Sequence, residues 1–322
     1  MTHADEVNAL VGHFYRSTLD ISLPEYRTAM LREVQKLISF DAGLWATSSE
    51  YSGRFHSLSL LGLDDGFGQR LQHDRNARPI LTAIHRQTST VRPQAEILPD
   101  ADFYASPIFE RLCQPFGIRQ LVGSARRQPE SGLHAMVGLF RFDQRQPFTQ
   151  DDRRIISHLI FHLMNAGAMA TSIYLQKNSR NDGRHGSVVC DSLGFHYGFD
   201  RDFGRLMREH FPAWDGGPLP FDLPERRDQT SFAREGLRFR QEPLGDLIHL
   251  SAWRNGPLDT LTAREREIVV SVCRGLSYKE VARPLGIAPS TVSNHLYRVF
   301  EKLGITSRTE LAKLVSETVR LH

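Results

Sequence analysis

The sequence predicts an α+β N-terminal part followed by an all-α C-terminal domain of four short helices. Two patterns lead to this expectation. Up to about residue 252, short β-branched and aromatic runs alternate with amphipathic stretches, as in sheets flanked by helices. Residues 258–322 carry only helix signals, which are hydroxyl-initiated caps, apolar residues at helical spacing and glycines where helices end.

Length and composition are those of a multi-domain globular protein. The chain has 322 residues, of which 40% are hydrophobic and 24% charged, so two or three domains are expected. No apolar run approaches the roughly 18 residues of a membrane span, and the N-terminus lacks the pattern of a secretory signal. Cys113, Cys190 and Cys273 lie far apart and indicate a reducing compartment. We expect a cytoplasmic protein without membrane contact.

Residues 1–177 are expected to form one α+β domain. Amphipathic stretches near residues 5–19 and 24–39 predict two helices. Four strand candidates follow, and the last two face each other across the turn sequence "PESG", which predicts a hairpin. In chain order the candidates are "AGLWATSS", "RFHSLSLLG", "RQLVGSARRQ" and "LHAMVGLFRF".

One long helix is predicted to close this domain. Thr149 is a suitable N-cap, and acidic residues follow in the first turn, where the helix dipole favours them. Apolar residues then recur at four-residue spacing and give the helix a broad apolar face. They are Ile155, Ile156, Leu159, Ile160, Leu163 and Met164. Because this stripe extends past one domain face, we expect the helix to contribute to a parallel dimer.

Residues 187–252 are expected to form a second, smaller α+β domain. Its strand candidates are "SVVCDS", "FHYGF", "LRFRQEP" and "DLIHLSAW", with a helix over "RDFGRLMREHF". Segments rich in Gly, Asn and Arg at residues 178–187 and 253–259 are interpreted as linkers.

Residues 258–322 predict four helices, at about 262–274, 277–285, 289–303 and 308–318. Three S/T-x-x-E pairs have the spacing of a capping box, and three glycines stand where helices would end. The pairs are Thr262–Glu265, Ser277–Glu280 and Ser307–Glu310, and the glycines are Gly275, Gly286 and Gly304. The formal net charge of +3 lies wholly within this segment, which permits binding to nucleic acid without requiring it.

The third of these helices has two different faces. Its apolar stripe consists of Val292, Leu296, Val299, Phe300 and Leu303. The opposite side carries Ser290, Ser293, Asn294, Tyr297, Arg298 and Glu301. The preceding helix ends at the tight turn "LGIA", and two short helices joined in this way form a helix-turn-helix, whose second helix can enter a DNA major groove. There, Asn can pair with adenine, Ser and Tyr can bond to base edges, and Arg can reach guanine or phosphate.

A polar helix face is more often merely solvated. The set of four helices, the short glycine turn and the local basic excess together favour DNA binding here.

The same segment carries a family resemblance. The motifs "LTAREREI", "GLSYKEVA", "LGIAPSTVSNH", "KLGI" and "SRTEL" follow one another without a gap. They resemble the LuxR-type (GerE-like) helix-turn-helix of bacterial transcription regulators. In that family the third helix reads the major groove and the fourth often supplies a dimer contact.

The resemblance implies roles for eight residues. Base reading is implied for Ser293, Asn294 and Tyr297. Contact with the DNA backbone is implied for Lys279, Ser290, Thr291, His295 and Arg298. Two positions depart from the family pattern. Ser293 stands where Lys or Arg is frequent, so its base contact is expected to be weaker or differently specific. Pro284 falls late in the second helix, which should therefore be short or kinked.

The N-terminal part resembles known sensor domains more loosely. The stretch "FDAGLW", the later hairpin and "PFTQDDRRIISHLIFHL" are similar to a GAF-like domain. The stretch "VVCDSLGFHYGFDRDFGRLMREHFPAW" resembles a PAS-like domain. These similarities imply a signal-input half. Trp45, Phe55 and Tyr104 are candidates to line an apolar ligand pocket, although such residues more often belong to the core.

Other chemistry finds little support in the sequence. His158 and His162 have the i, i+4 spacing of two metal ligands, but Leu159 stands where a HExxH motif has Glu. The stretch "GFGQR" at residues 66–70 is interpreted as a turn rather than a dinucleotide fingerprint. The acids of "LLGLDDGF" lack the alternating strands and helices of a phosphoacceptor receiver domain. We expect no catalytic residues, no metal and no cofactor, and so a protein that is not an enzyme.

The sequence thus predicts a homodimeric, one-component transcription regulator that responds to a small-molecule ligand. Its partner is double-stranded DNA, as an inverted repeat with half-sites about 10 base pairs apart or a multiple of that. Two alternatives remain. One is a quorum-sensing receptor for acyl-homoserine lactones, which would resemble this chain only at its C-terminal end. The other is a catalytic GAF or PAS module, for which the sequence contains no motif.

Overall fold

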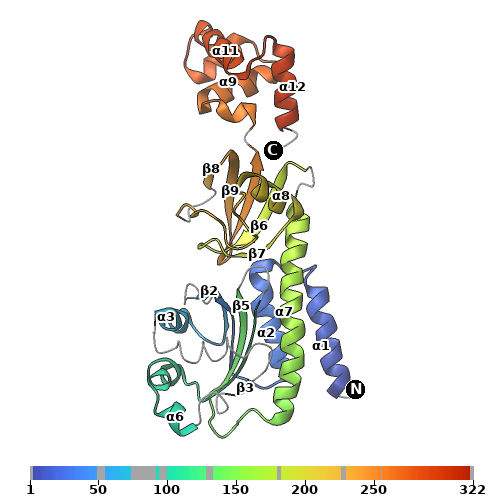
Figure 1. Ribbon diagram of the computed structural model, residues 1–322, viewed down its shortest axis with the longest axis vertical. Helices are drawn as coiled ribbons and strands as arrows, with labels where there is room; N and C mark the ends of the chain where they lie inside the picture. The colour runs from blue at the N-terminus through green and yellow to red at the C-terminus, as the bar shows by residue number, and fades with distance from the viewer. Residues whose placement is uncertain are drawn as a thin grey trace. The chain divides into compact units, whose positions relative to one another are not determined.

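The computed structural model describes residues 3–48, 55–73, 92–93, 100–127, 133–179, 183–225, 230–254 and 256–319. The chain separates into two compact units, Met1–Trp253 and Arg254–His322 (Figure 1). No helix in the described ranges is both long and apolar enough to cross a bilayer.

The N-terminal unit begins with a five-stranded antiparallel sheet in the order β2-β1-β5-β4-β3. Its strands are β1 (Ala42–Ser48), β2 (Phe55–Leu61), β3 (Arg92–Pro93), β4 (Gln120–Arg127) and β5 (His134–Arg141). The four predicted strands and the pairing of β4 with β5 are confirmed. The predicted "PESG" turn lies outside the described residues.

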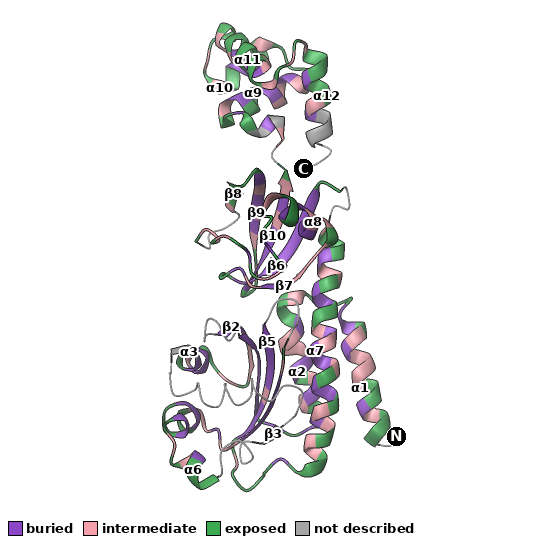
Figure 2. Cartoon of the chain, viewed as in Figure 1, coloured by how far each residue is buried: buried purple, intermediate pink, exposed green. Residues whose placement is uncertain are grey.

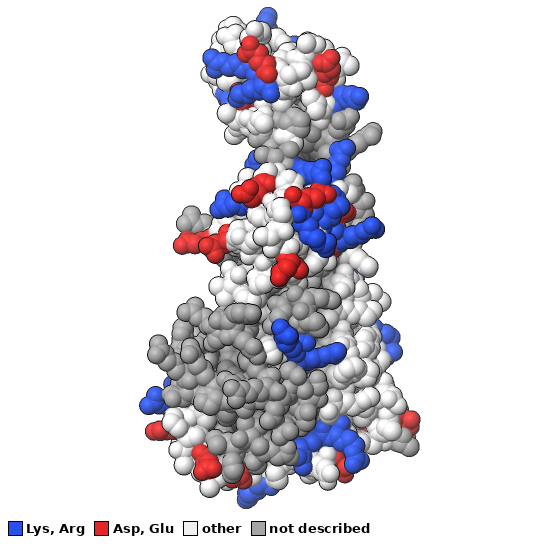
Figure 3. Space-filling view, in the orientation of Figure 1, with Lys and Arg blue, Asp and Glu red and all other residues white. Residues whose placement is uncertain are grey.

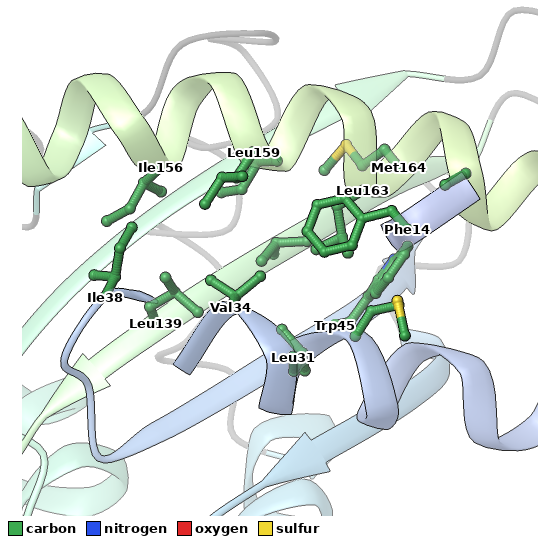
Figure 4. Close-up of a cluster of buried hydrophobic side chains, with 14 of the residues drawn as sticks. Phe14, Leu31, Val34, Ile38, Trp45, Leu139, Ile156, Leu159, Leu163 and Met164 are labelled. Carbon is green, nitrogen blue, oxygen red and sulfur yellow. The ribbon is translucent and has the colours of Figure 1, made fainter. Parts of the chain in front are cut away.

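Three helices cover one face of this sheet (Figure 1). They are α1 (His3–Ser17), α2 (Leu23–Leu37) and α7 (Gln150–Asn178). Their apolar sides bury Phe14, Leu31 and Leu163 against Trp45 and Leu139 of the sheet (Figure 4). Burial of this kind contributes about 1.5–3 kcal/mol for each large side chain. The long helix begins as predicted, since Thr149 and Asp152 form a capping box.

Shorter elements cover the opposite face of the first sheet. They are α3 (Asp65–His73), α6 (Asp100–Tyr104), the π-helical turn η2 (Phe109–Cys113) and the 3₁₀ turn η3 (Gln114–Phe116). The prediction of a turn at residues 66–70 was wrong, because these residues belong to α3. The carboxylate of Asp64 accepts the Phe67 N–H and starts the helix. A Cβ at Gly68 would approach the Leu58 side chain to 2.7 Å, so glycine here permits close packing rather than a turn.

A second five-stranded sheet follows, in the order β7-β6-β10-β9-β8. Its elements are β6 (His185–Cys190), β7 (His196–Phe199), α8 (Arg201–His210), β8 (Thr230–Arg234), β9 (Leu237–Leu244) and β10 (Leu247–Arg254). The sequence did not predict β8, an edge strand whose residues are all at least partly exposed and therefore lack apolar alternation. Numbered along the chain, both sheets have the strand order second, first, fifth, fourth, third.

Buried polar contacts join the two sheets within this unit. The Tyr197 and Thr47 hydroxyls form a hydrogen bond, and His56 Nδ1 lies 2.7 Å from the Asp191 carboxylate, with both side chains almost fully buried. The Arg27 guanidinium stacks on Tyr197, 5.3 Å from the ring centroid. The division into separate domains at residues 1–177 and 187–252 stays a prediction.

The C-terminal unit consists of one 3₁₀ turn and four helices. They are η4 (Pro257–Thr260), α9 (Ala263–Cys273), α10 (Tyr278–Leu285), α11 (Pro289–Leu303) and α12 (Arg308–Val319). The helix boundaries agree with the expected ones to within about a residue. Capping boxes form at Thr262–Glu265 and Ser277–Glu280, as predicted. At the third pair, Ser307 accepts the Glu310 N–H, but the Glu310 carboxylate bonds to Thr306 instead.

Candidate nucleic-acid interface

The helix pair α10–α11 is joined by three residues, Gly286 to Ala288. Gly286 has φ 63°, a left-handed conformation that glycine adopts without strain, and ends α10. The Ile287 N–H returns to the Ala282 carbonyl at 3.2 Å. Pro289 opens α11 at its first position, where its missing N–H leaves no bond unmade. The turn therefore fixes α11 against α10 as a helix-turn-helix.

Helix α10 is short, as Pro284 predicted. It has 8 residues, with Pro284 inside its last turn. Its first turn compensates, because Ser277 and Glu280 satisfy each other's backbone N–H groups. The Ser277 hydroxyl and N–H also hold the pKa of Glu280 below its usual value. Lys279 lies exposed on this first turn.

Helix α11 presents its two predicted faces. Val292, Leu296 and Val299 are buried in the core of the C-terminal unit. Five of the predicted DNA-contacting residues on this helix are exposed, and two are half-buried. The exposed residues are Ser290, Ser293, Asn294, Tyr297 and Arg298, and the half-buried ones are Thr291 and His295. Tyr297 is 66% exposed.

The polar groups on this face are not used inside the protein. Among the described residues, the side chains of Ser293, Asn294 and Tyr297 form no hydrogen bond, ion pair or ring contact. Their donors and acceptors therefore point to solvent and can pair with base edges without breaking an internal bond.

Several cations of the C-terminal unit have structural roles instead. Lys302 Nζ lies 2.7 and 2.8 Å from the two carboxylate oxygens of buried Glu265. Arg264 bonds to Glu267 and to the Leu285 carbonyl at the end of α10. Arg308 stacks 4.5 Å above the Tyr278 ring. These contacts tie the four helices together and reduce the charge that is available for DNA.

Other cations of this unit have no such contact within its described residues. They are Arg274, Lys279, Arg283 and Arg298, all exposed. Figure 3 shows basic and acidic side chains together on the visible face of this unit. Arg283 was not among the predicted DNA-contacting residues, although it stands four residues after Lys279 and therefore on the same side of α10. That spacing was the signal that could have identified it.

The three predicted pocket residues do not come together. Trp45 lies in the core beneath α7, whereas Phe55 and Tyr104 lie on the opposite face of the first sheet. The Tyr104 hydroxyl donates to the Arg119 carbonyl. None of the three lines the apolar cavity of about 70 Å³ that the structure contains.

This cavity lies between the first sheet and the short elements α3 and η2. Its walls include Leu44, Phe67, Ile108, Leu112, Met136 and Phe140. Gly123 and Gly138 face each other across β4 and β5 and leave the space open. Within the described lining no side chain is charged. Cys113 is part of this lining, and because burial raises the pKa of its thiol to about 12, it stays neutral. The glycines gave no sequence signal, because they lie inside strands.

The histidine pair on α7 is involved in packing. The rings of His158 and His162 meet edge to face, with centroids 4.8 Å apart. His162 Nδ1 bonds to the Tyr15 hydroxyl of α1 at 3.1 Å. The described residues contain no cluster of three or more groups that could hold a metal ion.

A helix-turn-helix whose second helix exposes a row of unengaged polar side chains has the arrangement with which DNA-binding domains enter the major groove. Residues 259–315 match the family model described as bacterial regulatory proteins, luxR family. The C-terminal unit therefore contains a helix-turn-helix domain of the LuxR family.

Relatives with this domain are transcription regulators by name. The transcriptional regulatory protein UhpA of Escherichia coli (strain K12) is 41% identical over 59 residues, which are 18% of this chain and 30% of UhpA. The probable transcriptional regulatory protein NarL of Mycobacterium tuberculosis (strain ATCC 25618 / H37Rv) is 43% identical over 60 residues, which are 19% of this chain and 26% of NarL. The matched stretch thus spans less than a third of either relative.

A solved structure of Escherichia coli SdiA aligns with 96% of this chain and 96% of its own. Its TM-score is 0.38 at 11% sequence identity, which is too low to support a statement about the N-terminal unit.

Proposed function

We propose that this protein is a sequence-specific, DNA-binding transcription regulator that acts by binding and not by catalysis. The observation that carries the proposal is the exposed polar side of α11, whose Ser293, Asn294 and Tyr297 have no partner among the described residues. A helix face built only for solvation has no need of an exposed Tyr beside short amide and hydroxyl groups. Those groups match the donors and acceptors of base edges.

The roles proposed for individual residues follow from their positions on α10 and α11. Ser293, Asn294 and Tyr297 read bases. Five further residues, which the sequence predicted, contact the DNA backbone. Arg283 is a sixth, which the structure adds. The five are Lys279, Ser290, Thr291, His295 and Arg298. A pair of such units in a homodimer would recognise an inverted repeat with half-sites about 10 base pairs apart or a multiple of that. We place this activity in the cytoplasm, where bacterial DNA is accessible.

We further propose that the N-terminal unit responds to an apolar ligand in the cavity of about 70 Å³. A cavity of about 150 Å³ holds benzene, so this one fits a small apolar molecule or the apolar end of a larger one. The described lining offers no hydrogen-bonding side chain for the amide and lactone of an acyl-homoserine lactone. Ser124 contributes backbone only, since it lies on the α7 side of β4 like Val122. The quorum-sensing alternative therefore gains no support from the cavity.

Selection from a random duplex library tests the DNA-binding function. The full chain should enrich an inverted repeat, and residues 254–322 alone should enrich its half-site. If only the fragment enriches a sequence, the N-terminal unit masks the DNA-binding domain. If neither enriches any sequence, the proposed function is wrong.

Binding of xenon, a small apolar probe of protein cavities, followed by xenon NMR, tests the cavity. Cys113→Leu fills space at the cavity wall and should abolish binding. Cys273→Leu makes the same change in the other unit and should leave binding intact. Equal binding to both variants would place the ligand elsewhere.

A further inference from the structure

Helix α7 carries an exposed face without charge. Residues 155–176 contain no Asp, Glu, Lys or Arg, although the helix is far from fully buried (Figure 2). Phe161 is 50% exposed and Met169 is 42% exposed. Ala168, which precedes Met169, and Ser172, which follows it by three residues, are also exposed. These four residues fall on one side of the helix, at i, i+7, i+8 and i+11.

Helix α8 of the same unit has a different surface. Helix α8 exposes Arg201, Arg208 and Glu209 within 10 residues. A solvated helix face is normally polar and charged. Exposed Phe and Met on a stretch of helix that carries no charged residue of its own are instead typical of protein–protein interfaces, whose centres are depleted in charged residues.

We infer that this uncharged face of α7, formed by Phe161, Ala168, Met169 and Ser172, is the surface through which two copies of this chain associate. The inference deepens the proposed function and rests on it, because an inverted repeat requires a dimer. A second copy is the occupant that the chemistry favours. A two-fold axis brings each residue close to its own counterpart, so a charged face would repel itself, whereas this face does not.

The surroundings of the face fit such an interface. The Arg126 guanidinium stacks on Phe161, 5.1 Å from its ring centroid, and donates to Asn165 Oδ1 at 2.8 Å. This cation lies at the edge of the uncharged face, as polar groups lie at the rim of an interface. Ala168 and Ser172 are small and one turn apart, which allows two helix backbones to approach closely.

The size of the face implies that α1 takes part. At 1.5 Å per residue and about 10 Å in width, the uncharged part of α7 offers roughly 330 Å². A standard interface buries about 800 Å² on each partner. Helix α1 packs beside α7 (Figure 1), and its residues 7–15 also contain no Asp, Glu, Lys or Arg. Leu19, just beyond α1, is 57% exposed.

Sedimentation equilibrium of the full chain tests this surface. Wild-type protein should be dimeric, and Ala168→Glu should raise the dimer dissociation constant at least about tenfold, because like charges then meet across the axis. Ala101→Glu makes the same exchange at an exposed alanine of α6, on the other side of the first sheet, and should have no effect. An equimolar mixture of Ala168→Glu and Ala168→Lys chains should restore association.

Unchanged association of Ala168→Glu, or a monomeric wild type at 100-fold the concentration that saturates DNA binding, would overturn the inference. Failure of the charge mixture to restore association would also overturn it, because the first variant would then act through its own fold. Binding to a single half-site duplex is measured in parallel. Its absence in wild-type protein would overturn the DNA-binding function and leave the result for the dimer surface standing.

Discussion

Asn294 is the residue at which the DNA-binding hypothesis can be tested most directly. It lies exposed near the start of α11 and has no partner among the described residues, and Asn is a bidentate partner of adenine. Ser293 beside it can accept or donate one bond, so it discriminates less than a Lys or Arg there would.

Asn294→Ala should therefore reduce discrimination at one base pair by about 1–3 kcal/mol. The fold should be unaffected because the side chain is exposed. Competition binding with single-base operator variants measures the effect, and Thr309→Ala, exposed on α12, is the control. An unchanged base preference would show that Asn294 does not read DNA.

Lys279→Ala should weaken binding to all sequences alike. Its side chain is a lone exposed cation on the first turn of α10, which suits a phosphate rather than a base. The slope of log binding constant against log salt should fall by about one unit for each half-site. A loss confined to one sequence would assign Lys279 to base reading.

At the scale of the element, capping and packing account for the shape of the C-terminal unit. Glu265 joins two functions, since it completes the capping box of α9 and binds Lys302 of α11. The Lys302 ammonium holds the pKa of Glu265 below its usual value. Because that pKa is depressed in the folded state, the pair stabilises the fold above the unfolded pKa and is lost as pH falls through the folded one.

Glu265→Gln should lower the free energy of unfolding of residues 254–322 by about 2 kcal/mol near neutral pH. Urea unfolding followed by far-ultraviolet circular dichroism measures this. Glu267→Gln is the matched control, because Glu267 lies on the same helix but its bond to Arg264 is exposed. Its cost should be at most about 0.5 kcal/mol. Equal losses in the two variants would remove any special role for the Glu265–Lys302 pair.

Local signals predicted some elements and not others. The caps at Thr149, Thr262 and Ser277 are short-range chemistry, so the starts of their helices could be predicted from the sequence. Gly68 was misinterpreted because its role is to let α3 approach β2, a tertiary contact. The cavity was missed for the same reason, since Gly123 and Gly138 matter only when their strands pair. Which cations bind carboxylates and which remain for DNA also depends on contacts between helices.

At the scale of the whole molecule, the N-terminal unit depends on buried groups that change charge with pH. Burial lowers the pKa of His249, although Glu242 and Asp200 oppose this and Arg240 adds to it. The pKa of His162 is lowered as well, first by burial and then by His158. The unfolded chain therefore binds more protons just below the ordinary histidine pKa of about 6.5. Stability is complete above that value and falls as pH decreases below it.

The urea concentration at the unfolding midpoint of the N-terminal unit should thus decrease when the pH is lowered from 7.5 to 5.5. His249→Gln should make this decrease smaller. Trp45, Trp214 and Trp253 all lie in this unit, so tryptophan fluorescence of the full chain reports it alone. A midpoint that rises towards pH 5.5 would contradict the assignment.

The engagement of Lys302 with Glu265 has a consequence for how the protein would behave in a living cell. Each phosphate that a protein neutralises makes its binding constant for DNA more sensitive to salt concentration. The bond of Lys302 to Glu265 leaves Arg298 as the cation of α11 that is available to phosphate, beside Lys279 and Arg283 of α10. When potassium accumulates in a cell, such a regulator would therefore lose less of its DNA affinity than one in which the residue at this position also contacts phosphate.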